Sequence, residues 1–404
     1  MREVVIVGAC RTAIGKAKRG SLVHTRPDDM GGAVLKALVE RVGIDPKEID
    51  DVIMGCAMPE AEQGMNVARL CVHLAGLPDE IAAMTLNRFC ASGLEAVWQM
   101  NNSILAGGAD VGIAGGTESM SMIPMGGNKI VPNIRLAKEY PHAYVSMGQT
   151  AENVAVKYDI SRQAQDQFVV DSQNKAIAAI ERGDFKEQIV PVQAYKYDGN
   201  GNKVEFTFEV DEGPRASTVE ALGKLRPAFA NPKGPVEGAG TVTAGNSSQM
   251  SDGASAVMLM TAEKAKELGL KPLAKLHGYT TVGLDPKLMG IGPALAIPKL
   301  IERFGPKLGI SYGDIDCVEL NEAFASQALY TIKVIEEKGL SGDKVNPNGG
   351  AIALGHPLGC TGAKLTTQLV HWLKDNNKRW GIVSMCIGGG MGAAGLFENL
   401  QYEA

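Results

Sequence analysis

The chain has 404 residues, of which 45% are hydrophobic and 21% are charged, and its formal net charge is −5. These proportions are typical of folded globular proteins and exclude collagen-like, coiled-coil and disordered chains. The length is sufficient for two or three packed units. A slight excess of acidic residues, without a long basic run, argues against a nucleic-acid partner.

The sequence carries no sign of membrane insertion or export. Its apolar stretches are shorter than the roughly 18 residues that a membrane-spanning helix needs. Residues 1–7 lead directly into a strand pattern, and the last four residues are not a peroxisomal signal of the Ser-Lys-Leu type. We therefore expect a cytoplasmic protein. Its 7 cysteines are scattered without a Cys-x-x-Cys pair, which predicts reduced thiols and neither a metal site nor a disulfide framework.

Short apolar runs predict strands, in chain order, at residues 4–7, 51–54, 111–114, 256–260, 317–320 and 381–385. Helical patterns, such as residues 31–42, separate them. Several runs are apolar on both faces, which favours an α/β fold with helices covering both sides of the sheet. Residues 119–250 differ, with scattered prolines, a helical pattern at 163–180 and polar turns from 195 to 240, and they predict a covering excursion from the sheet.

An internal repeat relates the two ends of the chain. Residues 49–52 (IDDV) are similar to residues 315–318 (IDCV), at an offset of 266 from 49 to 315. The same offset relates Cys90 to His356, and the strand at 111–114 has its expected partner near residues 382–385. If the halves pack about a pseudo-two-fold axis, their equivalent loops converge on one site. The alternative is a chance similarity between two ordinary βα units.

Two cysteines are candidates for chemistry. Cys90 precedes a helical pattern at 94–100, and a helix N-terminus favours the thiolate nucleophile. Cys386 follows the strand at 381–385 and opens a glycine loop, where free N–H groups could form an oxyanion hole beside a second acid or base. For each, a structural buried cysteine is the alternative.

Two further residues could assist them. His356 lies in a glycine-rich run, residues 348–363, which permits the close backbone approach that suits a catalytic base. Asn321 closes the strand at 317–320, where its amide could hold a water or a carbonyl, or could cap a helix.

Together with the polar turn at 245–253, these segments resemble the thiolase family of acetyl-CoA acyltransferases. The resemblance is carried by Gly-His-Pro-Leu-Gly at 355–359 and Cys-Ile-Gly-Gly-Gly-Met-Gly at 386–392, and it extends from the first strand to the last glycine loop. It implies an α/β fold of two related halves in a five-layered αβαβα core with an inserted loop domain. The expected bounds are 1–119 plus 251–272 for the N-terminal half, 120–250 for the loop domain and 273–404 for the C-terminal half.

The resemblance also implies a ping-pong reaction. Cys90, activated by His356, would take an acyl group from 3-oxoacyl-CoA or acetyl-CoA as a thioester, and Cys386 would move the proton of the second half-reaction. One oxyanion site would combine His356 with a water held by Asn321. The other would be the N–H groups of Cys90 and Gly388.

Substrate contacts carry over from the family as well. Ser248 would meet the pantetheine arm of coenzyme A, and Arg215 would lie at its nucleotide end. Met147 and Met289 would contact the substrate, with Met147 lining the acyl pocket. Coenzyme A is then a co-substrate, no metal or tightly bound cofactor is required, and the expected assembly is a homodimer or homotetramer.

Several sequence features bear on the substrate range. Ser146 stands where biosynthetic acetoacetyl-CoA thiolases often carry histidine, and the link at 231–240 is longer than usual. The runs at 289–294 and 358–362 favour a degradative 3-oxoacyl-CoA thiolase over a short-chain acetoacetyl-CoA enzyme. A ketoacyl synthase would lack the second cysteine, Cys386. A non-catalytic acyl-CoA-binding or scaffolding protein, or a Cys-His hydrolase, would also be compatible with these residues.

Overall fold

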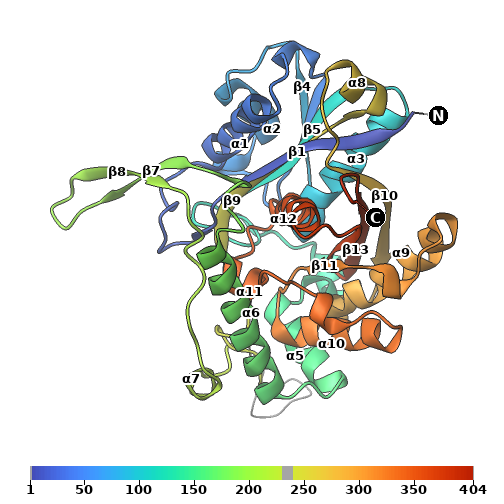
Figure 1. Ribbon diagram of the computed structural model, residues 1–404. Coiled ribbons are helices and arrows are strands. Elements are labelled where there is room, and N and C mark those ends of the chain that lie inside the picture. The colour runs from blue at the N-terminus through green and yellow to red at the C-terminus, as the bar shows by residue number, and fades with distance from the viewer. Residues whose placement is uncertain (1, 230–239, 404) are drawn as a thin grey trace.

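A large mixed sheet organises the protein, whose computed structural model describes residues 2–229 and 240–403 (Figure 1). In the described chain this sheet has 11 strands, and its main path runs β11-β12-β13-β10-β1-β9-β5-β3-β4. The strands on this path are β1 (Val4–Thr12), β3 (Asp51–Gly55), β4 (Ala82–Leu86), β5 (Val111–Ser119), β9 (Ser251–Thr261), β10 (Ala274–Gly283), β11 (Cys317–Leu320), β12 (Trp380–Ile387) and β13 (Met391–Asn399). Two short strands, β2 (Gly15–Lys16) and β6 (Ile189–Val190), pair with β9 and β1.

The strand order confirms the internal repeat. From β1 outward the sheet continues β9, β5, β3, and from β10 outward it continues β13, β12, β11. In the N-terminal half β3 and β5 pair in parallel, and β5 and β9 pair antiparallel. In the C-terminal half β11 and β12 pair in parallel, and β12 and β13 pair antiparallel. The halves meet where β1 and β10 pair antiparallel, at Ile6 and Ala274.

Helices complete the layers. The outer helices are α1 (Pro27–Val42) and α2 (Val67–Leu74) on the N-terminal half, and α9 (Gly292–Leu308) and α10 (Ala325–Glu337) on the C-terminal half. The helices α3 (Ser92–Leu105) and α12 (Thr361–Asp375) pack on each other between the halves, with α12 near the centre of Figure 1. This order of layers confirms the predicted αβαβα fold.

Burial on both faces explains the strand sequences. Every residue of β1, β5 and β9 is buried, as the continuous apolar runs predict for strands between two helical layers. All six predicted strands are present, and five of them are longer than predicted, because small residues beyond each apolar run are buried too. The strands β10 and β13 were missed because glycine and polar residues interrupt their patterns, whereas their sheet neighbours bury them.

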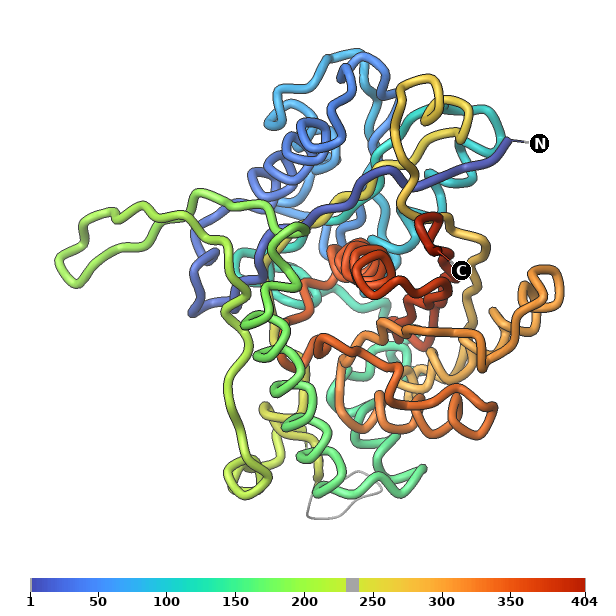
Figure 2. The backbone as a smooth tube through the Cα atoms, viewed as in Figure 1, coloured from blue at the N-terminus to red at the C-terminus, as the bar shows by residue number. Residues whose placement is uncertain are grey.

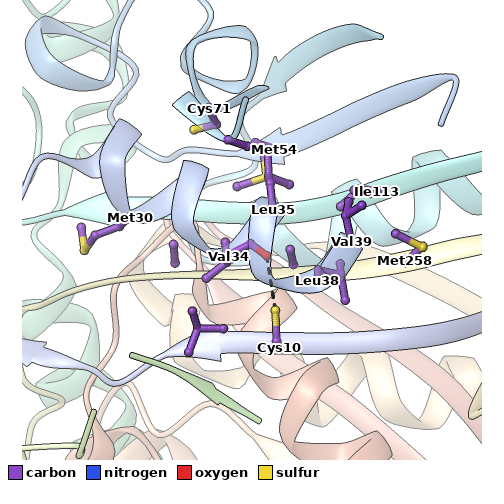
Figure 3. Close-up of a cluster of buried hydrophobic side chains, with 14 of the residues drawn as sticks. Cys10, Met30, Val34, Leu35, Leu38, Val39, Met54, Cys71, Ile113 and Met258 are labelled. Carbon is purple, nitrogen blue, oxygen red and sulfur yellow. Dashed lines mark hydrogen bonds between the residues drawn. The ribbon is translucent and has the colours of Figure 1, made fainter. Parts of the chain in front are cut away.

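Side chains of α1 form the outer core of the N-terminal half with β1, β3, β5 and β9 (Figure 3). Cys10 and Cys71 belong to this cluster, and the Cys10 thiol donates to the carbonyl of Val34 at 3.4 Å. Burial raises the pKa of Cys10 to about 12 and that of Cys71 beyond its usual range. These two thiols are structural.

The segment between β5 and β9 covers one side of the core. It contains α4 (Ile134–Glu139), α5 (Met147–Lys157), α6 (Arg162–Arg182), the hairpin β7 (Val192–Tyr197) and β8 (Lys203–Phe208), and α7 (Val219–Gly223). The helical pattern at 163–180 is confirmed by α6. The prediction of polar turns from residue 195 was wrong for residues 195–197 and 203–208, which belong to the hairpin that projects from the molecule in Figure 2, whereas residues 209–218 lie outside helices and strands as predicted. The long link at 231–240 lies, except for its last residue, outside the described residues.

Two short helices flank other parts of the core, α8 (Ala262–Glu267) after β9 and α11 (Ala351–Leu354) ahead of His356. None of the described helices has the length and apolar character needed to cross a membrane.

Glycines allow the central helices to touch. A Cβ added at Gly362 of α12 would collide with the backbone nitrogen of Leu94 in α3, and one at Gly93 would press on the backbone of Ala363. Because backbone atoms cannot move aside as a flexible side chain does, this contact requires glycine on both helices.

We expect Gly362→Ala to destabilise the fold by about 1–3 kcal/mol or more through overpacking. Alanine is the better helix former by roughly 1 kcal/mol, so propensity alone would give the opposite sign. The matched control is Gly223→Ala in α7, where an added Cβ meets nothing within 4 Å. Thermal unfolding of both variants checks this, and a Gly362→Ala melting temperature at or above that of the parent would contradict it.

Candidate active site

Cys90 lies at the entrance to α3. It belongs to a short 3-10 helix, Phe89–Ala91, that runs directly into α3, so the predicted position at a helix N-terminus is confirmed. The preceding residue, Phe89, has φ 44, a left-handed conformation that a bulky residue adopts at a cost. The Ser92 hydroxyl, which donates to the Phe89 carbonyl at 2.7 Å, holds this turn in place.

The surroundings of Cys90 keep it protonated. Backbone N–H bonding at the helix N-terminus does favour the thiolate, as predicted, but burial outweighs it and raises the pKa of Cys90 to about 11. Hydrogen bonding from the backbone of Gly388 and of Cys90 itself acts in the opposite direction. These are the two N–H groups expected to form an oxyanion hole, and both act on the Cys90 sulfur.

His356 is buried, with both ring nitrogens engaged. Nδ1 lies 2.6 Å from the Thr361 hydroxyl, whose own hydrogen is donated to the Pro357 carbonyl at 2.9 Å. Nδ1 therefore carries the proton and donates it to Thr361, which leaves the lone pair on Nε2. Burial, followed by the nearby cation of Lys364, lowers the pKa of His356 to about 3. The imidazole is thus a neutral base at physiological pH.

Asn321 faces the basic nitrogen of this histidine. Its Nδ2 lies 3.3 Å from His356 Nε2, and its backbone is fixed by a bond to the Ser384 carbonyl at 2.9 Å. Asn321 does not cap a helix, since α10 begins at Ala325. Its Oδ1 is buried without a hydrogen-bond partner in the described part of the chain. Such an open acceptor is suited to a water or a substrate hydrogen.

The second cysteine belongs to the C-terminal half. Cys386 lies within β12, not after a strand as predicted, because β12 continues to Ile387 before turning tightly into β13. Burial, and next the charge of Cys90, raise the pKa of Cys386 well above its usual value. The two sulfurs are therefore near enough for the charge of one to disfavour the thiolate of the other. The turn places Gly388 beside both.

The polar turn predicted at 245–253 docks against the same residues. The N–H of Ser248 donates to the Ala323 carbonyl at 2.9 Å, two residues beyond Asn321. The N–H of His356 donates to the Gln249 carbonyl at 3.1 Å. Ser248 therefore lies at the rim of the site, between the strand end that carries Asn321 and the histidine loop.

Two methionines lie on the Cys386 side. Met147 begins α5, and a Cβ added at Gly388 would lie 3.5 Å from its sulfur. Met289 is buried and shares one hydrophobic cluster with Cys386, against which Met147 packs. Both predicted substrate contacts thus border the site, in an apolar environment that Phe229 and Phe324 complete.

Arg215 is exposed on the stretch between β8 and α7, and its N–H donates to Gln173 at 2.8 Å. In the described residues no hydrogen bond joins it to the catalytic candidates. The chain near it is tied to the site indirectly, because the Gln249 amide donates to the Gly213 carbonyl at 3.2 Å. This position is on the periphery of the site.

The sequence analysis did not identify the residues that hold the catalytic candidates in place. Thr361 fixes the tautomer of His356, and Glu118 joins the two halves by accepting from the N–H groups of Ala57 at 2.7 Å and Gly359 at 2.8 Å. A signal for Thr361 did exist, since a threonine begins the helix that follows the histidine loop. For Glu118, which simply ends a strand, no local signal exists.

Comparisons with known proteins identify the family of this chain. The thiolase N-terminal domain matches residues 4–263, and the thiolase C-terminal domain matches residues 270–399. The chain belongs to the thiolase family. It is 52% identical to a 3-ketoacyl-CoA thiolase of Bacillus subtilis (strain 168), over 98% of this chain and 100% of that protein. It is 46% identical to peroxisomal 3-ketoacyl-CoA thiolase A of Mus musculus, over 98% of this chain and 91% of that protein.

Among solved structures, the crystal structure of the Bacillus anthracis acetyl-CoA acetyltransferase matches with a TM-score of 0.86 and 40% identity, over 99% of both chains. The protein is a thiolase-family acyltransferase, acting by thiolytic cleavage or the reverse condensation. None of these comparisons favours a ketoacyl synthase, a hydrolase or a non-catalytic binding protein.

We expect Thr361→Val to lower the kcat of this thiolase by about 10- to 100-fold, because the imidazole loses the partner that fixes its tautomer and orientation. Thr366→Val is the matched control, since among the described residues the Thr366 hydroxyl of the same helix bonds only the Gly362 carbonyl, at 2.8 Å. Steady-state kinetics should show KM little changed in both. Equal kcat values for the two variants would contradict this role of Thr361.

Proposed function

We propose that this thiolase cleaves 3-oxoacyl-CoA with coenzyme A, giving acetyl-CoA and a shortened acyl-CoA, and that it also catalyses the reverse condensation. The observation that carries the proposal is that Cys90 lies near Cys386 and also packs with Leu358 of the loop that carries a neutral His356. Two thiols and one base are what the two half-reactions need.

In the first half-reaction Cys90 attacks the 3-oxo carbonyl as His356 removes the thiol proton. A neutral imidazole is required, since the pKa of Cys90 near 11 leaves almost no thiolate at physiological pH. The N–H groups of Cys90 and Gly388 stabilise the oxyanion of the tetrahedral adduct. The carbon–carbon bond then breaks, which leaves an acyl thioester on Cys90 and the enolate of acetyl-CoA.

The enolate is handled on the other side of the site. Its oxygen is stabilised by His356 and by a water that Asn321 holds through its open acceptor. Cys386 donates the proton that converts the enolate into acetyl-CoA. It then takes the proton of coenzyme A, whose sulfur attacks the acyl group on Cys90. In the condensing direction the same steps run in reverse.

We infer a preference for chains longer than acetoacetyl from two features. The relatives named 3-ketoacyl-CoA thiolase match over nearly their whole length. In this chain the Cys386 side is lined by flexible methionines, Met147 and Met289, which can rearrange around acyl groups of different length. The short-chain alternative is an acetoacetyl-CoA thiolase. Ser248 and Arg215 would contact the pantetheine and nucleotide ends of coenzyme A.

The remaining expectations belong to the same proposal. Coenzyme A is a co-substrate and no tightly bound cofactor is needed. The protein would work in the cytoplasm as a homodimer or homotetramer. Its units would be residues 1–119 with 251–272, 120–250 and 273–404.

Cleavage of acetoacetyl-CoA and of a longer 3-oxoacyl-CoA, followed by absorbance at equal concentrations, tests the substrate range. We expect both to be cleaved, the longer one with the higher kcat/KM. Cleavage of acetoacetyl-CoA alone would establish the short-chain alternative instead.

Cys90→Ala should abolish cleavage and leave no acyl group on the protein by mass spectrometry, because the acceptor sulfur is gone. Cys10→Ala, at a structural thiol, is the control and should remain active and acylated. Substantial cleavage by Cys90→Ala would remove Cys90 from the role of nucleophile.

Cys386→Ser should lower cleavage and condensation by about 10²- to 10⁴-fold, the usual contribution of a general acid or base. Acetyl-CoA should still acylate Cys90 to a measurable extent. Loss of acylation together with unchanged carbon–carbon bond chemistry would reverse the roles of the two cysteines.

A further inference from the structure

A buried lysine lies directly behind the histidine loop. Lys364 and Thr361 are three residues apart on α12, and therefore share one face of the helix. Thr361 bonds the imidazole, whereas Nζ of Lys364 donates to the carbonyl of Gly355 at 3.2 Å. The same helix thus holds His356 by its ring and by the residue before it.

Both sides of the peptide that joins Gly355 to His356 are held. Its carbonyl accepts from Lys364, and its N–H donates to the Gln249 carbonyl at 3.1 Å and to the Ser251 hydroxyl at 3.2 Å. Gly355 itself has φ 92 and ψ 159, a conformation that is essentially restricted to glycine. Glycine at position 355 permits this geometry, and the hydrogen bonds with Lys364, Gln249 and Ser251 hold the peptide in it.

The charge of Lys364 has a distinct environment. Its side chain is fully buried, and the groups that act on it are Arg11, Asp211, Cys360 and Glu319. Arg11 and Asp211 neutralise each other through two bonds of 2.8 Å. Glu319 has a buried carboxylate oxygen without a partner in the described residues. Burial raises the pKa of Glu319 to about 8, so that group is largely uncharged at neutral pH, and no direct ion pair quenches the cation of Lys364 in the described chain.

We propose that Lys364 is a positioning residue for the acyl-transfer reaction, which clamps the Gly355–His356 peptide and adds a positive charge that further disfavours protonation of the imidazole. The proposal rests on the function of His356 proposed above. It is supported by electrostatics, since Lys364 is the charged group that, after burial, lowers the pKa of His356. Burial in turn lowers the pKa of Lys364 to about 8.

Lys364→Met tests this, because methionine keeps an unbranched side chain and removes the cation and its donors. We expect kcat to fall by about 10- to 100-fold with KM little changed, as the misplaced base acts only in the chemical step. Without the cation the pKa of His356 rises, so its protonation, and with it the acid limb of kcat against pH, moves to higher pH.

Three variants make the result decisive. Lys364→Arg restores a cation with donors and should recover most of kcat. Lys344→Met removes a lysine that bonds a backbone carbonyl, that of Gly313 at 3.0 Å, outside the site, and should leave kcat and the pH profile unchanged. If Lys364→Met fails to fold in thermal unfolding, Lys364→Gln, which keeps a donor without the charge, should still show the shifted acid limb.

The outcomes separate this inference from the proposed function. Full activity in His356→Gln would overturn the proposed function itself. An inactive His356→Gln together with a wild-type kcat and pH profile in the folded Lys364→Met or Lys364→Gln variant would overturn only the role of Lys364. Failure of Lys364→Arg to recover activity would equally overturn it, since neither charge nor donor would then be what the site needs.

Discussion

The contact between α3 and α12 is the constraint on which the rest of the structure depends. One helix starts beside Cys90 and the other starts just after the loop that carries His356. Gly93 and Gly362 let the two backbones touch, so the helix that follows Cys90 and the helix that follows the His356 loop pack directly on each other, and Cys90 shares a hydrophobic cluster with Leu358 of that loop. The duplicated fold supplies equivalent strands and helices in each half, and the contact between α3 and α12 joins the two sets at one site.

Burial then decides how that site works. It raises the pKa of Cys90 to about 11 and lowers that of His356 to about 3, so a resting thiolate–imidazolium pair is disfavoured on both sides. The thiol and the base are therefore neutral before reaction, and charge develops only as the thiol attacks. The hydrogen bond from Gly388 is aimed at where that charge appears, which is how a preorganised site favours the transition state.

The polar groups around His356 are held by hydrogen bonds to other parts of the chain. Its ring, its N–H and the carbonyl before it have partners from α12 and from the turn before β9, so little freedom remains. In this setting the open oxygen of Asn321 is the exception. A buried acceptor without a partner in the described chain costs stability, and it lies where the reaction needs a water.

The sequence by itself determined the α/β alternation and the repeat, and it pointed to four candidate reactive residues, because apolar runs, glycine loops and a fixed offset can be found in the chain without its fold. The tertiary structure alone decided that Cys386 lies inside a strand, that Cys90 is a thiol at rest, and that Thr361 and Lys364 hold the base. The reason is physical. Desolvation and hydrogen bonding depend on which distant segments surround a group, and those neighbours are set by packing between the halves.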